Sequence, residues 1–270
     1  MAADHRLVSQ RFPRSSKYHP DWVIASASGG ANSLWLIEWL AERLDLEPGM
    51  RVLDLGCGLA ASSIFLRREY GVQIWATDLW FSGSENLHRI RDAGVEDGVF
   101  PMHTDARSLP FAADFFDAVV SIDSFPYYGT DDLYLNYIAR FVKAGGALAI
   151  AGAGLMQEID GYLIIFDCGG NLACGACTRQ PGGGGTGSGP LSSPSKSPTT
   201  MPEEWQAWLA WQRAVAPENA TEIEAVQVDR GRFIGYVRLV GRRRPDAQLE
   251  EPIVSIPTQY TRKLLLRLEG

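Results

Sequence analysis

The stretch Val52-Leu53-Asp54-Leu55-Gly56-Cys57-Gly58 decides the fold of this chain. The apolar run from Arg51 to Leu55 predicts a short buried strand, and the pattern of Ala60–Tyr70 predicts a helix directly after it. The glycines between these two elements let the backbone turn tightly and approach a ligand closely. The stretch therefore predicts a strand–turn–helix unit with a ligand at the turn.

Strands and helices alternate along the chain around this turn. Helical spacing occurs at 33–44, 84–93 and 133–142, and strand-like stretches occur at 73–77, 99–104, 116–122 and 147–151. Strands that alternate with helices of roughly ten residues are typical of right-handed βαβ units and a parallel sheet. We therefore predict an α/β fold: a Rossmann-like, doubly wound, mainly parallel sheet with helices on both faces, perturbed after the fifth strand.

Residues 161–200 break this alternation. They contain ten glycines and four prolines, a composition that cannot bury enough apolar surface to offset the entropy of the chain. Two explanations stay open: a natural flexible insertion, or translation out of frame between codons 161 and 199. The predicted organisation is an N-terminal arm (1–32), a Rossmann-like core (33–160), this Gly/Ser/Pro-rich irregular segment (161–200), and a C-terminal helix and closing strand of the same domain (201–270).

The glycine turn by itself fits two kinds of cofactor, because its letters also match a loose dinucleotide fingerprint. Asp54 would repel a pyrophosphate but would attract a cationic amino-acid ligand. Asp78 ends the next predicted strand, where a carboxylate can accept hydrogen bonds from the ribose of either cofactor. No Tyr-x-x-x-Lys pair lies near the predicted sheet, which disfavours an NAD(P)-dependent oxidoreductase of the short-chain dehydrogenase type.

Four blocks of sequence resemble the class I S-adenosylmethionine-dependent methyltransferases, over about residues 33–155. They are "VLDLGCG" at 52–58, "ATD" at 76–78, "DARSLPFAADFFDAVVS" at 105–121 and "KAGGALAI" at 143–150. The resemblance implies that residues 33–160 bind S-adenosylmethionine. It assigns the methionine part to Asp54 with Gly56, Cys57 and Gly58, the ribose to Asp78, and the adenine to Asp105 with Ala106. We add Leu79 and Ser121 to the same predicted site. One departure from the family is Ala60, which stands where many members carry a third glycine.

The methyl acceptor is expected beyond the carboxyl ends of the strands, where ligands bind in open α/β sheets. Asp123 follows the fourth predicted strand and is our candidate for a proton acceptor or an orienting group. The alternative is that Asp123 only caps the turn after the strand or is a surface acid bound to water. Tyr127 is a second candidate, as a catalytic or pocket-lining group, although aromatic residues at strand ends also pack in cores.

The resemblance implies a transferase that methylates a small-molecule acceptor. Two alternatives stay open: a protein of this fold that binds the cofactor but is catalytically impaired by the 161–200 segment, and an NAD(P)-dependent oxidoreductase.

Composition argues against several other classes of partner. The chain carries a net charge of −7 and four lysines, and the run Arg242–Arg244 is short, so no nucleic-acid partner is expected. No stretch of 18 apolar residues occurs, which predicts no membrane span, and the first residues lack the apolar region of a secretory signal. The pair Cys174 and Cys177, with Cys168 and no nearby histidine, is one ligand short of a zinc site, so no metal is expected. We therefore expect a cytoplasmic protein and leave its oligomeric state open.

Overall fold

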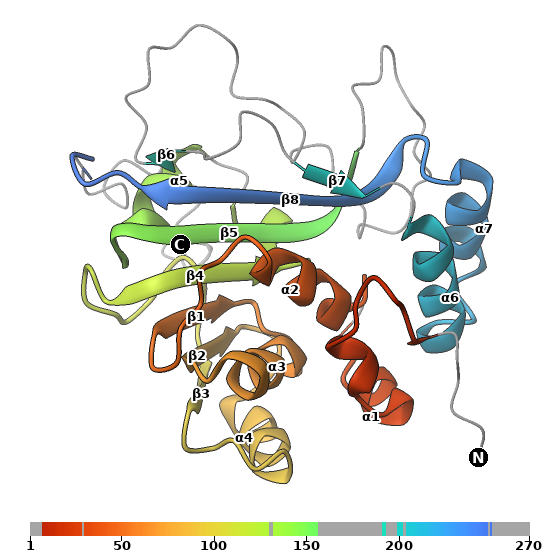
Figure 1. Cartoon of the computed structure of the whole chain (residues 1–270), viewed down its shortest axis with the longest axis horizontal. Helices are drawn as coiled ribbons and strands as arrows, with labels where there is room; N and C mark the ends of the chain where they lie inside the picture. The colour runs from red at the N-terminus through yellow and green to blue at the C-terminus, as the bar shows by residue number, and fades with distance from the viewer. Residues whose placement is uncertain are drawn as a thin grey trace, which may run out of the picture.

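The structure is a computed structural model that describes residues 7–28, 30–129, 132–155, 191–192, 199–201, 204–247 and 249. In these residues an eight-stranded sheet has the order β3-β2-β1-β4-β5-β8-β6, and β7 also pairs with β8 (Figure 1). The strands are β1 (Arg51–Leu55), β2 (Gln73–Asp78), β3 (Val99–His103), β4 (Phe116–Ile122), β5 (Val142–Leu155), β6 (Leu191–Ser192), β7 (Thr199–Met201) and β8 (Ile234–Arg243). Strands β1 to β5 are parallel, and β8 runs antiparallel to β5.

Helices cover both faces of this sheet. They are α1 (Pro20–Ala25), α2 (Ser33–Ala41), α3 (Ala61–Tyr70), α4 (Gly83–Asp92), α5 (Asp132–Ala139), α6 (Trp205–Val215) and α7 (Ala220–Asp229). Side chains alternate along β1, so Val52 packs in one core cluster and Leu53 in another. The first cluster contains buried residues of α2, α3 and α6, and the second contains buried residues of α5. The predicted Rossmann-like fold with a mainly parallel sheet is confirmed.

The start of β5 differs from the prediction. The sequence predicts a strand that begins at residue 147, whereas β5 already begins at Val142. Phe116 pairs with Val142 while Ala118 pairs with Ala147, so the extra residues form a bulge within the strand. Gly145 permits this bulge because its φ is +78°, a value that side chains disfavour.

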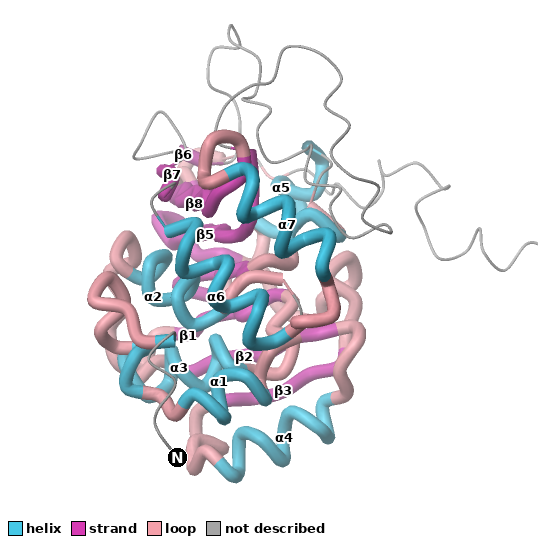
Figure 2. The backbone as a smooth tube through the Cα atoms, turned by 90° about the vertical axis from the view of Figure 1, so that its right-hand side faces the viewer, coloured by secondary structure: helices cyan, strands magenta, loops and turns pink. Residues whose placement is uncertain are grey.

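The C-terminal part contains two helices, although the sequence predicted one. In Figure 1 the parallel strands run toward the right, and α6 and α7 lie at that end of the sheet. They lie in front of the strand ends in the view of Figure 2. Helices α6 and α7 therefore lie at the end of the sheet where the predicted ligand turn is. The predicted irregular segment 161–200 lies outside the described residues, except for the strand residues of β6 and β7.

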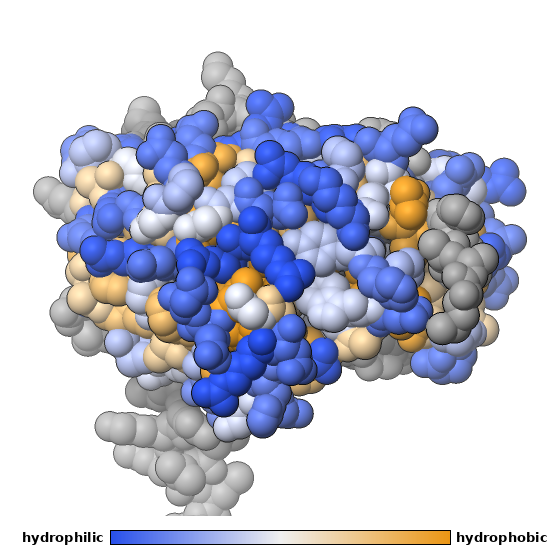
Figure 3. Space-filling view, turned by 60° about the horizontal axis from the view of Figure 1, so that its bottom comes forward, coloured by the Kyte–Doolittle hydropathy of each residue, from blue (hydrophilic) through white to orange (hydrophobic). Residues whose placement is uncertain are grey.

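The surface carries its charges in pairs at the basic run of β8. Arg242 forms an ion pair with Asp45, Arg243 with Asp114, and Arg244 with Asp246. The face seen in Figure 3 is mostly hydrophilic, with hydrophobic side chains in small separate patches. Among the described residues, no helix has the combined length and apolarity that crossing a membrane requires. The described side chains also form no group of three or more potential metal ligands, and Cys168, Cys174 and Cys177 lie outside them.

Candidate active site

The glycine turn is held against the neighbouring strand by its backbone. The amides of Gly56 and Cys57 both donate to the carbonyl oxygen of Thr77, at 2.9 and 3.0 Å. Gly56 has a φ of +74°, and a Cβ built on it would lie 2.6 Å from the Cβ of Ser124. Both the backbone angle and the close approach therefore require glycine here.

Asp54 lies beneath this turn. Its side chain is fully buried, and its Oδ2 accepts hydrogen bonds from the hydroxyl groups of Ser62 and Ser63 of α3, each at 2.6 Å. Its Oδ1 is buried and has no hydrogen-bond partner among the described residues. Burial raises the pKa of Asp54 to about 6, and the charge of Asp78 adds to this rise against the two serine hydrogen bonds. The carboxylate thus ties the start of α3 to β1.

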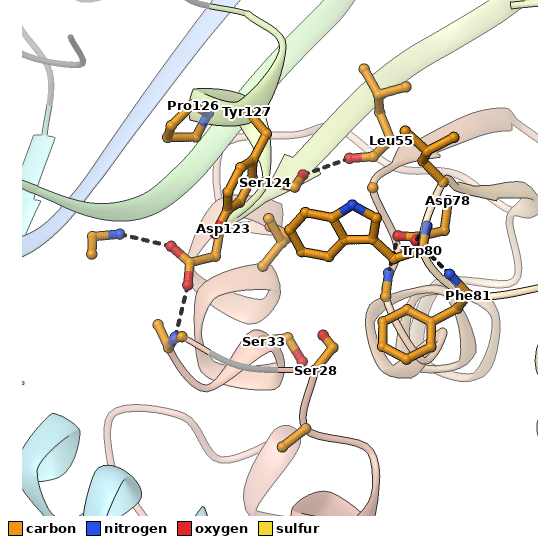
Figure 4. Close-up of a pocket in the computed structure, with 18 of the residues that line it drawn as sticks. Ser28, Ser33, Leu55, Asp78, Trp80, Phe81, Asp123, Ser124, Pro126 and Tyr127 are labelled. Atoms are coloured by element: carbon orange, nitrogen blue, oxygen red, sulfur yellow. Dashed lines mark hydrogen bonds between the residues drawn. The ribbon is translucent and has the colours of Figure 1, made fainter. Parts of the chain in front are cut away.

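Asp78 connects the glycine turn to the loop after β2. Its Oδ2 accepts from the amide of Gly58 at 2.8 Å, and its Oδ1 accepts from the amides of Trp80 and Phe81 at 2.7 and 3.0 Å (Figure 4). Leu79, between them, is about half exposed. The end of β2 therefore presents a carboxylate whose position is fixed by three backbone donors.

The loop after β3 brings a third acid to the same side. The Asp105 carboxylate accepts from the Arg107 backbone amide at 2.9 Å and from its guanidinium group at 3.0 and 2.8 Å. The carbonyl oxygen of Ala106 accepts from the hydroxyl group of Tyr134 at 2.9 Å. These contacts fix the two residues that the family resemblance assigned to the adenine.

The end of β4 packs against the end of β1 through hydroxyl groups. Ser124 and Tyr128 both donate to the carbonyl oxygen of Leu55, each at 2.8 Å. The Ser121 hydroxyl lies 2.9 Å from both of these hydroxyl groups and is buried behind them. Cys57 is also buried, and the amide nitrogen of Asn86 lies 3.7 Å from its Sγ.

Asp123 joins three segments that are far apart in the sequence. It adopts a positive φ of 51°, and its carboxylate accepts from the amide of Ala31 at 2.8 Å and from that of Ala153 at 3.2 Å (Figure 4). Burial raises its pKa above the ordinary value, while the two amides oppose that rise. Tyr127 lies close by, with its ring edge-on to Trp80 at a centroid distance of 5.0 Å. Both aromatic rings are more than half exposed.

These segments enclose a cavity of about 910 Å³. Eight of the predicted site residues line it: Gly56, Gly58, Asp78, Leu79, Asp105, Ala106, Asp123 and Tyr127. The other three, Asp54, Cys57 and Ser121, are buried and are not among the lining residues. The structure thus brings most of the predicted residues to one cavity and places the rest behind its wall.

The polar residues that α6 and α7 contribute to this cavity, Gln212, Asn219 and Glu222, were not predicted from the sequence. Glu222 accepts from the side-chain amides of Gln212 at 2.6 Å and Asn219 at 2.8 Å. The pKa of Glu222 is raised by burial and then by the charge of Asp123. Trp211 and Gln212 also donate to the carbonyl oxygen of Gly30, at 2.9 and 3.3 Å. The spacing of Asn219 and Glu222 is a helix-start signal that could have indicated α7, but not its place over the cavity.

Comparison with known proteins agrees with this arrangement. The sequence pattern of the methyltransferase domain family matches residues 53–150. The chain is 36% identical over 126 residues to the methyltransferase GfsG of Streptomyces halstedii. The matched stretch covers 46% of this chain and 45% of that protein. It is 33% identical over 110 residues to the O-methyltransferase resE of Aspergillus sclerotiorum, covering 40% of this chain and 42% of that protein. The chain thus spans less than half the length of these curated relatives.

Solved structures share the fold over a longer stretch. One is a SAM-dependent methyltransferase from Geobacter sulfurreducens in complex with S-adenosyl-L-homocysteine, with a TM-score of 0.54 and 18% identity over 77% of this chain and 90% of that one. Another is a geranyl diphosphate C-methyltransferase from Streptomyces coelicolor A3(2), with a TM-score of 0.54 and 19% identity over 77% of both chains. The comparisons favour neither the oxidoreductase nor the catalytically impaired alternative. Residues 53–150 of this chain therefore carry the sequence pattern of the methyltransferase domain family.

Proposed function

We propose that this chain binds S-adenosylmethionine in the 910 Å³ cavity and methylates a small organic acceptor. The observation that carries the proposal is the contact between the glycine turn and Asp78. The amide of Gly58 donates to the Asp78 carboxylate at 2.8 Å, and both residues line the cavity inside a methyltransferase domain. Bare backbone and a fixed carboxylate thus stand next to each other at the carboxyl ends of two parallel strands.

The residues present fit this cofactor. A Cβ at Gly56 would lie 2.5 Å from the Oγ of Ser124, and one at Gly58 would lie 2.3 Å from the Oγ of Ser28, so both cavity-lining positions require glycine. In our proposal this turn holds the methionine part, Asp78 the ribose, and Asp105 with Ala106 the adenine. Leu79 would flank the cofactor at the cavity wall. Asp54, Cys57 and Ser121 would support the turn from behind, and the unpartnered Oδ1 of Asp54 gives the turn a negative underside.

When bound, the cofactor supplies a methyl group on a cationic sulfur. The protein's part is then to hold an acceptor in line with that group and to exclude water. Asp123 lies on the cavity wall with its carboxylate fixed by two backbone amides, which suits a group that orients the acceptor or takes its proton. Tyr127 would form the neighbouring wall.

We also propose the coarser features that the sequence suggested. These are a cytoplasmic location, supported by a cysteine content that makes no disulfide framework, and no nucleic-acid partner, supported by the net charge of −7. The division of the chain at residues 32, 160 and 200 stays a proposal as well. Sequencing the gene tests whether 161–199 are out of frame, because an uninterrupted frame in independent isolates would refute it.

The experiment is a binding comparison on the full chain. S-adenosylhomocysteine at about one hundred times its Kd should raise the free energy of unfolding by about 2.7 kcal/mol, whereas NAD(P) should leave it unchanged. Asp78→Asn should weaken S-adenosylhomocysteine binding by about tenfold, because hydrogen bonds to a charged acceptor are lost. The matched control Asp21→Asn changes an exposed acid away from the cavity and should bind normally. Stabilisation by NAD(P) without stabilisation by S-adenosylhomocysteine would refute the proposal.

A further inference from the structure

The charges that line the cavity are strongly unbalanced. Its described lining residues include four acids, which are Asp78, Asp105, Asp123 and Glu222, and one cationic side chain, Arg107. Arg107 forms an ion pair with Asp105 at 2.8 Å, on the side that we assign to the adenine. In the proposed function Asp78 binds the ribose. Asp123 and Glu222 are then left facing the acceptor side.

These two acids reach the cavity from different elements and interact electrostatically. Asp123 follows β4 and Glu222 lies on α7, and the charge of Asp123 raises the pKa of Glu222. Each carboxylate is held in place by N–H donors, from Ala31 and Ala153 in one case and from Gln212 and Asn219 in the other. Two fixed carboxylates in a partly buried site favour a cationic ligand, because a positive charge relieves their repulsion.

The rest of the wall suits an organic cation rather than a bare ion. Trp80 and Tyr127 are 66% and 53% exposed, line the cavity, and offer aromatic surface that attracts cations. Trp208 of α6 lines the same cavity and is 3% exposed, so another aromatic side chain forms part of this wall.

We propose that the methyl acceptor is an organic amine, with its nitrogen between Asp123 and Glu222 and its carbon skeleton against Trp80 and Tyr127. This inference rests on the proposed function and names the substrate class of the same site. A bound ammonium group transfers one proton to the Glu222 carboxylate. The freed lone pair forms the nitrogen–carbon bond to the methyl group, and the sulfur–carbon bond breaks with its electron pair on sulfur. The methylated nitrogen then carries the positive charge, and Glu222 returns its proton to water.

Binding rather than turnover tests this inference. Isothermal titration of the full chain, saturated with S-adenosylhomocysteine, compares three probes of similar shape: 2-phenylethylamine, 2-phenylethanol and 3-phenylpropanoate. The amine should bind about tenfold more tightly than the alcohol, because charged hydrogen bonds exceed neutral ones by that order, and the carboxylate should bind most weakly. Glu222→Gln should remove most of the preference for the amine and keep the affinity for S-adenosylhomocysteine. Glu224→Gln, an exposed acid on the same helix, should keep both.

The outcomes separate the two proposals. Loss of S-adenosylhomocysteine binding in the native chain would refute the proposed function itself. If that ligand binds but the alcohol or the carboxylate equals the amine, or the amine does not bind, the amine acceptor is refuted and the methyltransferase stands. A preference for the amine that survives Glu222→Gln would also refute the assigned site. The native chain's probe series decides the substrate class even if the variant does not fold.

Discussion

At the scale of single residues, Asp54 shows how the turn depends on protonation. Its carboxylate is buried beneath the glycines, and its pKa of about 6 lies above the ordinary 3.8 of an aspartate. Between these two values the folded chain holds a proton that the unfolded chain has lost. The free energy of unfolding therefore falls as the pH rises through this window. Above about pH 6 the buried carboxylate is ionised in the folded chain as well, and the full loss of stability is present.

Asp54→Asn should remove this dependence. The native chain should lose on the order of 3 kcal/mol of stability from this group between about pH 4 and about pH 6, and the variant should not, because asparagine does not ionise. Urea denaturation at several pH values measures the difference between the two profiles. Asp21→Asn, at an exposed site, serves as control and should follow the native profile. Parallel profiles for Asp54→Asn and the native chain would contradict the raised pKa.

At the scale of elements, the α6–α7 pair is attached to the loop that precedes α2. Trp211 donates to the carbonyl oxygen of Gly30, and the next residue, Ala31, donates to Asp123. The loop is thus held between α6 and the end of β4, on the wall of the cavity. The conformation of this loop therefore depends on a hydrogen bond between two residues that are 181 positions apart in the sequence.

Trp211→Phe should loosen this loop. The substitution keeps an aromatic ring but removes the indole donor, so we expect a loss of about 1 kcal/mol in the free energy of unfolding. Hydrogen exchange should quicken in a peptide over residues 30–34 and stay unchanged over β1. The same substitution at Trp205, at the start of α6, is the matched control and should leave both peptides unchanged. Equal exchange in the two variants would mean that this hydrogen bond does not hold the loop.

Elements whose signal is local could be predicted from the sequence, and those set by distant contacts could not. The sequence placed β1, β2 and α3 within one or two residues, because their apolar runs and glycine boundaries are local. It missed the bulge in β5, which depends on pairing with β4. It also missed Glu222, because the position of α7 over the cavity follows from tertiary packing. Asp54 was predicted as a cofactor-binding residue next to the turn, but its place behind the cavity wall could not be predicted, because it is held there by two serines of the next helix.

At the scale of the whole molecule, the N-terminal residues form part of the packed structure around the site. Phe12 is fully buried and stacks on Trp35 of α2 at a centroid distance of 5.9 Å. Trp35 in turn contacts the ring of Trp211 at 6.5 Å. One row of aromatic rings therefore links the N-terminal segment, the first helix of the core and α6, which the sequence analysis had divided among three parts of the chain.

If these parts fold as one unit, Phe12→Ala should behave as a core mutation. Loss of a buried phenylalanine costs about 3–5 kcal/mol, because the transfer free energy of the ring is lost and a cavity stays behind. Val8→Ala is the control, since Val8 is 53% exposed and its truncation should change stability by less than about 0.5 kcal/mol. Urea denaturation of the full chain, followed by tryptophan fluorescence, should show one transition that shifts as a whole in Phe12→Ala. A loss below about 1 kcal/mol would instead mark residues before α1 as an arm that packs weakly, because the core would then not depend on Phe12.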